Sequence, residues 1–158
     1  AEYLVERLVE HVNQKESLND IRNAFLRDRS HGSLIFTVDD LNILVKSGRL
    51  SKIQGMIGNL LKIKPILRFD QGKLSVEHKV RSTDGVVNYL TSEVGKLSEK
   101  AKTVVRITYT TTSDVAHQFY DMVKEKFDNV SVKISGTISA VIAVHVGKAG
   151  LGIYLANE

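Results

Sequence analysis

The chain contains no cysteine, no tryptophan and only one proline. Without cysteine it can form no disulfide, no thiolate nucleophile and no cysteine-ligated metal centre. This absence fits a reducing compartment, so we expect the protein to be cytoplasmic. Aromatic residues make up 6% of the sequence, which leaves few side chains that could stack on nucleic acid bases.

Long hydrophobic runs are also missing. The longest candidate, ISAVIAVHV (Ile138–Val146), is about half of the roughly 20 residues that a membrane-spanning helix needs. The N-terminal stretch AEYLVERLVEHV is amphipathic and acidic early on, which is not a secretory pattern. We therefore expect no integral membrane segment.

The formal net charge is +4, from 22 basic and 18 acidic residues. A basic chain raises nucleic acid binding as a possibility. Here, however, the lysines and arginines are spread along the sequence rather than gathered in one tract. The distribution favours a mildly basic surface, or a docking face for an acidic partner, and we expect no nucleic acid ligand.

Motifs that carry enzyme chemistry are absent as well. The sequence contains no P-loop, no Rossmann glycine triplet, no HExxH and no GxSxG. The stretch HVGKAGLG lacks the first glycine and the Ser/Thr of a phosphate loop, and it is interpreted as a tight turn. No histidine spacing supports a metal site, and four histidines in polar contexts are predicted to be solvated: His11, His31, His78 and His117. We expect no catalytic residue, metal or cofactor, and so no enzyme.

What is present is an alternation of helical and strand patterns over one domain, residues 1–158. The order is two helices, a strand, two helices, a hairpin, and then strands alternating with helices. This order predicts an α/β protein of the α+β kind, a two-layer sandwich in which a mixed sheet has its helices mainly on one face. The expected helices cover 2–14, 18–28, 39–48, 51–61, 85–100, 114–127 and 137–146, and the expected strands 33–38, 64–69, 74–81, 102–111, 129–136 and 151–157.

The most hydrophobic predicted helix carries two glycines, Gly55 and Gly58, where alanine would be more stable by about 1 kcal/mol each. Because they lie three residues apart, they share one helix face. Such a face suits either the close approach of another backbone or an alkyl chain lying along the helix, to which a methionine adapts. The apolar residues around the two glycines are Ile53, Met56, Ile57, Leu60 and Leu61.

Three basic side chains lie at predicted element ends. His145 ends an apolar run directly before Val146–Gly147, where its ring could cap helix carbonyls or donate to an anionic head group at the mouth of an apolar pocket. Arg49 follows a helix break and Arg81 ends a strand. Both arginines suit either a solvated surface or the binding of a carboxylate or phosphate.

One long segment resembles a known family. FTVDDLNILVKSGRLSKIQGMIGNLLKIKPILRFDQGKLSVEHKVR looks like the core of the DegV family of fatty-acid-binding proteins. In that family DxLxYLxxGGRIS leads into a helix rich in small residues, then LLxIKPIL, a short hairpin and KVR. The ending VHVGKAGLGIYL is similar to the family's HTGPGALGI, so the resemblance runs from about Leu34 to Leu155.

The resemblance implies a carrier that performs no chemistry. The family binds one long-chain fatty acid, such as palmitate, stearate or oleate, in a tunnel between two domains. It presents the carboxylate to a partner, the catalytic subunit of fatty acid kinase. The alternative is a protein-interaction or regulatory module that uses the same apolar face without lipid, with an exposed patch along Ile53–Leu61 and no depth for a ligand.

The resemblance also implies roles for individual residues. His145 matches the family histidine that helps to hold the carboxylate, and Gly147 matches its tight turn. Arg49 and Arg81 match the GGR and KVR arginines, for kinase docking or head-group electrostatics. The expected acyl tunnel comprises Phe36, Ile53, Gly55, Met56, Ile57, Gly58, Leu60 and Ile142.

Three departures from the family pattern stand out. Ser47 replaces a glycine, and Lys148–Ala149 replaces the Pro-Gly of the terminal motif. The family's N-terminal domain, which supplies Thr and Ser ligands for the head group, has no counterpart in the sequence. We therefore expect the chain to be the C-terminal lipid-binding domain of a longer protein and its own N-terminal domain to be a partner.

Overall fold

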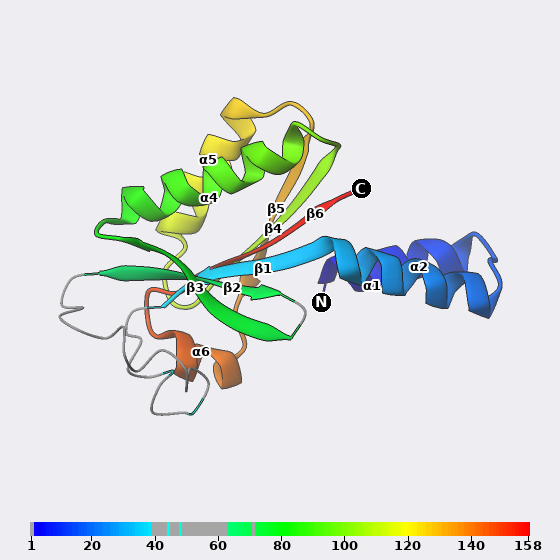
Figure 1. Ribbon diagram of the computed structural model, residues 1–158, viewed down its shortest axis with the longest axis horizontal. Helices are drawn as coiled ribbons and strands as arrows, with labels where there is room; N and C mark the ends of the chain where they lie inside the picture. The colour runs from blue at the N-terminus through cyan, green and yellow to red at the C-terminus, as the bar shows by residue number, and fades with distance from the viewer. Residues whose placement is uncertain (1, 39–43, 45–47, 49–62, 71) are drawn as a thin grey trace.

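The computed structural model describes residues 2–38, 44, 48, 63–70 and 72–158, which form one sheet with helices on both of its faces and beyond one end (Figure 1). The predicted helices at 39–48 and 51–61 lie largely outside these residues. In chain order the elements are α1 (Glu2–Asn13), α2 (Leu18–His31), β1 (Gly32–Thr37), β2 (Lys64–Asp70), β3 (Lys73–Val80), α4 (Thr83–Ser98), β4 (Thr103–Tyr109), α5 (Asp114–Lys126), β5 (Val130–Thr137), α6 (Ala140–Val146) and β6 (Leu151–Asn157).

The sheet has six strands in the order β3-β2-β1-β6-β4-β5. Its neighbouring strands are antiparallel except for β4 and β5, which are parallel. A parallel pair needs a crossover, and α5 supplies it. The predicted mixed sheet of an α+β protein is therefore confirmed.

One face of the sheet, which we call the first face, packs against α4 and α5 (Figure 1). Successive side chains of a strand point to opposite faces, so alternate residues of each strand enter this core. The helices contribute an apolar stripe at helical spacing. Side chains with 0% exposure in this core include Ile35, Ile66, Ile107, Ile153, Val87, Leu90, Val94, Phe119 and Val123.

The helices that the structure describes cover the opposite, second face less completely. Near one end of the sheet Tyr3 of α1 packs on Val104 and Ala156. Near the other end Val146 of α6 lies in a small cluster with Leu67 of β2. Figure 1 shows α6 on the side of the sheet away from α4 and α5, while α1 and α2 form a hairpin that projects past the sheet.

A buried ion-pair cluster fastens β2 to α4 on the first face. Arg68 donates hydrogen bonds to Glu77 and Ser33, each at 2.7 Å, and to Glu93 of α4 at 2.5 Å. The side chain of Glu93 is only 9% exposed and that of Arg68 21%, so loss of Glu93 would remove the more buried of the two carboxylates that pair with Arg68. Because Arg68 points to the first face, its neighbours Leu67 and Phe69 are directed to the second.

Local signals account for some element ends. The side chain of Ser17 accepts a hydrogen bond from the backbone N–H of Asp20 at 3.2 Å and so caps α2. Pro65 is the second residue of β2, near the start of the strand, where a residue that cannot donate to the ladder is tolerated. The expectation that His11 is solvated is wrong, because its residue is 9% exposed and its Nδ1 lies 2.9 Å from Glu16.

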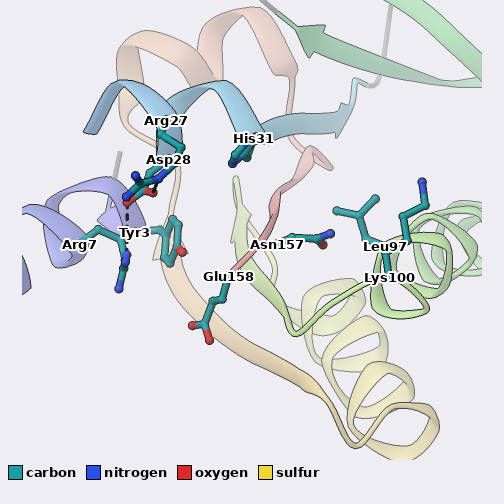
Figure 2. Close-up of a pocket in the computed structure, with 9 residues that line it drawn as sticks. All are labelled: Tyr3, Arg7, Arg27, Asp28, His31, Leu97, Lys100, Asn157 and Glu158. Carbon is teal, nitrogen blue, oxygen red and sulfur yellow. Dashed lines mark hydrogen bonds and ion pairs between the residues drawn. The ribbon is translucent and has the colours of Figure 1, made fainter. Parts of the chain in front are cut away.

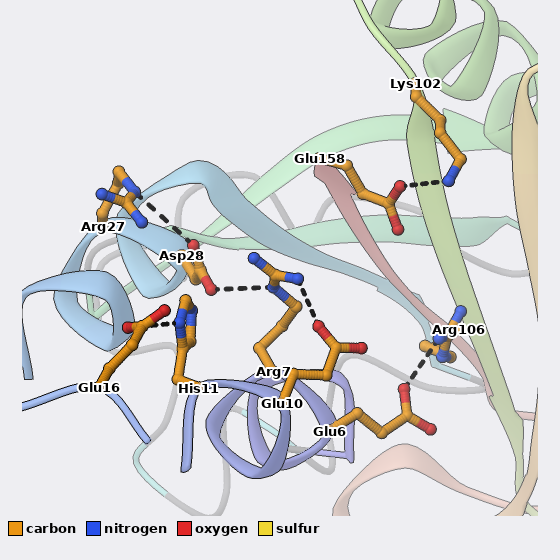
Figure 3. A network of polar contacts seen from close by, with 10 residues as sticks. All are labelled: Glu6, Arg7, Glu10, His11, Glu16, Arg27, Asp28, Lys102, Arg106 and Glu158. Carbon is orange, nitrogen blue, oxygen red and sulfur yellow. Dashed lines mark hydrogen bonds and ion pairs between the residues drawn. The ribbon is translucent and has the colours of Figure 1, made fainter. Parts of the chain in front are cut away.

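Polar contacts attach α1 to the second face (Figure 3). Arg106 of β4 donates to Glu6 at 2.8 Å, and its guanidinium lies 5.7 Å from the centre of the Tyr3 ring. Lys133 of β5 contacts Glu2 at 2.6 Å and Glu6 at 3.2 Å. The hydrogen bond from Arg106, followed by that from Lys133, lowers the pKa of Glu6 below its ordinary value of 4.5.

Protonation of Glu6 is expected to weaken this attachment. Because the pKa of Glu6 is lower in the folded state, its stabilising effect is complete above pH 4.5 and is lost as the pH falls through the folded pKa. Glu6→Gln should lower the melting temperature by at most about 4 °C at neutral pH, the effect of about 1 kcal/mol for a partly exposed pair, and by nothing at acid pH. Thermal melts between acid and neutral pH measure the difference in melting temperature between the variant and the natural chain. Glu125→Gln on α5 is the control, and a Glu6→Gln curve parallel to that of the natural chain would contradict the assignment.

Candidate functional site

An apolar groove of about 570 Å³ lies between the second face of the sheet and α6. Its volume is within the range of roughly 300–1,000 Å³ that is usual for small-molecule sites. The described residues that line it come from β1, β2, β3, β4, β5, β6 and α6 and the segments beside them: Leu34, Phe36, Leu44, Phe69, Leu74, Thr108, Thr137, Ile138, Ser139, Ile142, His145, Val146 and Gly152.

One residue in the floor of the groove, Gly152 of β6, has no side chain. In the sheet register Gly152 lies between Phe36 of β1 and Thr108 of β4. A Cβ atom at this position would lie 3.1 Å from the Thr108 Oγ1 atom and 3.6 Å from the Phe36 Cβ atom. A larger residue at this position would therefore press against Thr108 and narrow the groove.

The roof of the groove is α6, which is held at its C-terminal end. Gly147 ends the helix with φ 91° and ψ −175°, a conformation that is essentially restricted to glycine. Thr110 at the end of β4 fixes the turn that follows, because its hydroxyl donates to the carbonyl of Lys148 at 2.6 Å and accepts from the N–H of Gly150 at 2.9 Å. Val146 covers Gly150 so closely that a Cβ atom there would lie 2.1 Å from the Val146 Cγ1 atom.

His145 is the ionisable side chain among the described residues that line the groove. It lies three residues after Ile142, so the two share the face of α6 that is turned to the groove. The imidazole is half-buried, and no described residue hydrogen-bonds to it. Such a ring can donate a hydrogen bond to an anionic group, and it carries a positive charge when protonated.

The structure brings together three of the residues singled out from the sequence: Phe36, Ile142 and His145. Gly147 lies just beyond them at the turn and lines the outer side of α6. Arg81 is exposed one residue after β3 and does not line the groove. The remaining candidates lie outside the described residues: Arg49, Ile53, Gly55, Met56, Ile57, Gly58 and Leu60.

Several groove residues were not identified from the sequence. Leu34 belongs to a strand that is apolar on both faces, and such a strand needs cover on both. That pattern could have pointed to a second apolar layer. Phe69 and Leu74 flank the β2–β3 turn as a cross-strand pair, but a register shift in this hairpin hides from the sequence which side chains share a face.

A second cavity, of about 630 Å³, lies between the α1–α2 hairpin and the ends of α4 and β6 (Figure 2). Its walls are largely polar, and two of its arginines are directed at Asp28, with Arg7 at 3.3 Å and Arg27 at 3.9 Å. This cavity is much less suited to an alkyl chain than the groove beneath α6. Among the described residues no cluster of three or more histidine, aspartate or glutamate side chains could hold a metal ion. None of the helices described is long and apolar enough to cross a membrane.

The backbone at Gly147 gives a direct test of how α6 is held. Gly147→Ala should lower the free energy of unfolding by about 1–3 kcal/mol, because alanine is strained at φ 91°. Gly95→Ala is a matched control, since the added Cβ in α4 meets Phe127 at an ordinary 3.4 Å and alanine favours the helix. Urea unfolding measures both variants. Equal stability of the two would show that the turn does not constrain α6.

The known proteins that are similar to this chain in sequence carry the same family name. A family model described as "Uncharacterised protein, DegV family" matches residues 1–158. A DegV domain-containing protein of Staphylococcus aureus (strain MRSA252) is 29% identical over 159 positions, which cover 99% of this chain and 56% of the relative. The chain thus spans about half the length of the curated relatives that it matches.

Solved structures of similar proteins have the same fold. One is described as a fatty acid binding DegV family protein from Streptococcus agalactiae, with a TM-score of 0.84, 28% identity, and coverage of 99% of this chain and 55% of that one. Another is the Streptococcus pneumoniae Fatty Acid Kinase (Fak) B3 protein loaded with linoleic acid, with a TM-score of 0.85, 24% identity, and the same two coverages of 99% and 55%. At 24% identity, the similarity to the S. pneumoniae protein shows a shared fold and nothing further.

Proposed function

The chain belongs to the DegV family, as the resemblance in its sequence implies, and we propose that it binds one long-chain fatty acid in the groove beneath α6. The carboxylate would lie near His145. The observation that carries this proposal is an apolar groove whose described lining includes one ionisable side chain, at the end of a short helix. The fatty acid binding that is described for the S. agalactiae protein supports it.

The energetics of such a site favour an alkyl ligand. Three large side chains of the groove are partly open to water without a ligand, with exposed fractions of 39% for Leu34, 44% for Phe69 and 53% for Ile142. An acyl chain that covered them would gain about 0.8 kcal/mol for each methylene that it buries. Tight binding therefore needs few polar contacts, and His145 would serve mainly to orient the ligand.

We further propose that the protein is a carrier that presents the carboxylate to a fatty acid kinase. The naming of the S. pneumoniae neighbour as a fatty acid kinase component supports this partner. Docking of the kinase by Arg49 and Arg81 stays a prediction, as do the preference for palmitate, stearate or oleate and the position of this chain as the C-terminal domain of a two-domain protein.

A protein-interaction module is the alternative function. The exposed fractions of Leu34, Phe69 and Ile142 are compatible with this alternative, because a partner protein that buried these apolar side chains would also be stabilised by the hydrophobic effect. The volume of the groove favours a lipid instead, since a docking face needs no depth. Organic extraction of the purified protein, followed by mass spectrometry, separates the two functions. Extraction of one fatty acid per chain supports the carrier, whereas a protein that holds no lipid and takes up no added oleate favours the module.

The role of His145 is tested by substitution. His145→Ala should weaken oleate binding by about 10- to 100-fold, the effect of one hydrogen bond to a charged group, while His145→Gln should retain part of the affinity through its amide donor. Displacement of a fluorescent fatty acid measures both. His117→Ala on the exposed surface of α5 is the matched control. Unchanged affinity of His145→Ala would place the carboxylate elsewhere.

A further inference from the structure

The second cavity, beside the α1–α2 hairpin, lies apart from the groove beneath α6, and we call it the hairpin cavity (Figure 2). It has a volume of about 630 Å³, and its lining includes Asn157 and Glu158, at and just beyond the C-terminal end of β6. The groove is lined by Gly152, near the start of the same strand. Five residues of a strand cover roughly 17 Å at about 3.3 Å per residue, so the two are separate sites.

The acidic side chains of the hairpin cavity already have basic partners. Asp28 lies 3.3 Å from the Nε atom of Arg7 and 3.9 Å from that of Arg27. Glu158 lies 2.6 Å from the Nζ atom of Lys102, which does not line the cavity (Figure 3). Both negative charges of the cavity are therefore compensated within the protein.

Three basic side chains of the hairpin cavity are not compensated in this way. Among the described residues, none hydrogen-bonds to or pairs with the ring of His31 or the ammonium group of Lys100. Arg27 approaches Asp28 only through its Nε atom, so its two terminal nitrogens have no acceptor in the described part of the chain. Positive charges around one cavity repel each other, and a bound anion would offset this repulsion.

The ends of two helices are another reason for cations at this place, because the last carbonyls of a helix attract positive charge. α2 ends at His31 and α4 at Ser98, both beside the hairpin cavity. However, their last turns also contain Arg29 and Lys96, and neither of these lines the cavity. The helix ends therefore do not require the cations that line it.

The rest of the lining supplies hydrogen-bond donors and an apolar wall. The Oδ1 atom of Asn157 accepts a hydrogen bond from Thr103 at 3.2 Å, which leaves the amide N–H groups for a ligand. Tyr3, which is 6% exposed, and Leu97 contribute hydrocarbon. Arginine and lysine bind phosphate and carboxylate oxygens through charge-assisted hydrogen bonds, and the volume of the cavity is that of a small-molecule site.

We propose that the hairpin cavity binds a small polyanion, a molecule with two or more phosphate or carboxylate groups. Arg27 of α2 and Lys100, two residues after α4, hold it from opposite sides of the cavity (Figure 2). His31 and Asn157 supply further hydrogen bonds. This site is separate from the fatty acid groove and does not depend on the proposed function.

Isothermal titration calorimetry with pyrophosphate at constant ionic strength tests the proposal. Arg27→Gln and Lys100→Gln should each weaken binding by about tenfold, the effect of one hydrogen bond to a charged group. Arg22→Gln on the same helix and Lys124→Gln on α5 are the matched controls, because both side chains are exposed, lie outside the cavity lining and lose the same charge. The two controls should bind pyrophosphate as the natural chain does.

Nuclear magnetic resonance gives the position of the ligand independently. Addition of pyrophosphate should shift the side-chain amide signals of Asn157 and leave the backbone signal of Gly152 unchanged. His145→Ala, which alters the groove, should bind pyrophosphate with the affinity of the natural chain. Titrations with citrate, a polycarboxylate, and with acetate, which carries a single charge, complete the series.

Tenfold weakening in the two cavity variants, with natural affinity in the controls, supports the site. Binding of both pyrophosphate and citrate assigns it to small polyanions in general, whereas binding of one alone restricts the ligand to phosphates or to carboxylates. If the natural chain binds neither, or if Arg22→Gln weakens binding as much as Arg27→Gln, the inference is overturned and these basic side chains form only a solvated surface.

Discussion

The unequal cover of the two sheet faces is the constraint on which the rest of the structure depends. α4 and α5 pack on the first face, and residues such as Phe119 and Ile153 have no exposed area there. The second face carries apolar side chains along β1 and β2 as well, yet of the helices that the structure describes only α1 and α6 contact it, near its two ends. An apolar strand face without full cover costs stability in water, and the groove beneath α6 is where this cost is concentrated.

Two local devices keep that groove open instead of letting it collapse. The turn after α6 is held by the Gly147 backbone and by the two hydrogen bonds of Thr110, which anchor the end of the helix to β4. On the opposite face Arg68 binds Glu93 and so connects β2 to α4. Leu67 and Phe69 flank Arg68 in β2, so their side chains point to the second face. The contact between Arg68 and Glu93 on the first face therefore also orients these two side chains.

The sequence predicted which segments form helices and strands better than it predicted which side chains meet on one face of the sheet. The strand pattern at 151–157 and the short apolar helix before Gly147 both correspond to the structure, because local spacing determines them. The groove residue Gly152 could not be identified in this way. Its importance comes from Phe36 and Thr108 on neighbouring strands, which are more than 40 residues away in sequence. His11 was misjudged for the same reason, since its burial depends on tertiary contacts rather than on its polar neighbours in the chain.

The arrangement also explains how a carrier could bind tightly and still release its cargo to a partner. In the proposed complex most of the affinity comes from methylenes that lie against apolar side chains such as Phe69. His145, half-buried at the end of α6, would contribute orientation and one hydrogen bond. In this arrangement the carboxylate would lie near the C-terminal end of α6, where the helix ends at Gly147. A kinase would need access only to this end, while the acyl chain stayed bound throughout the transfer.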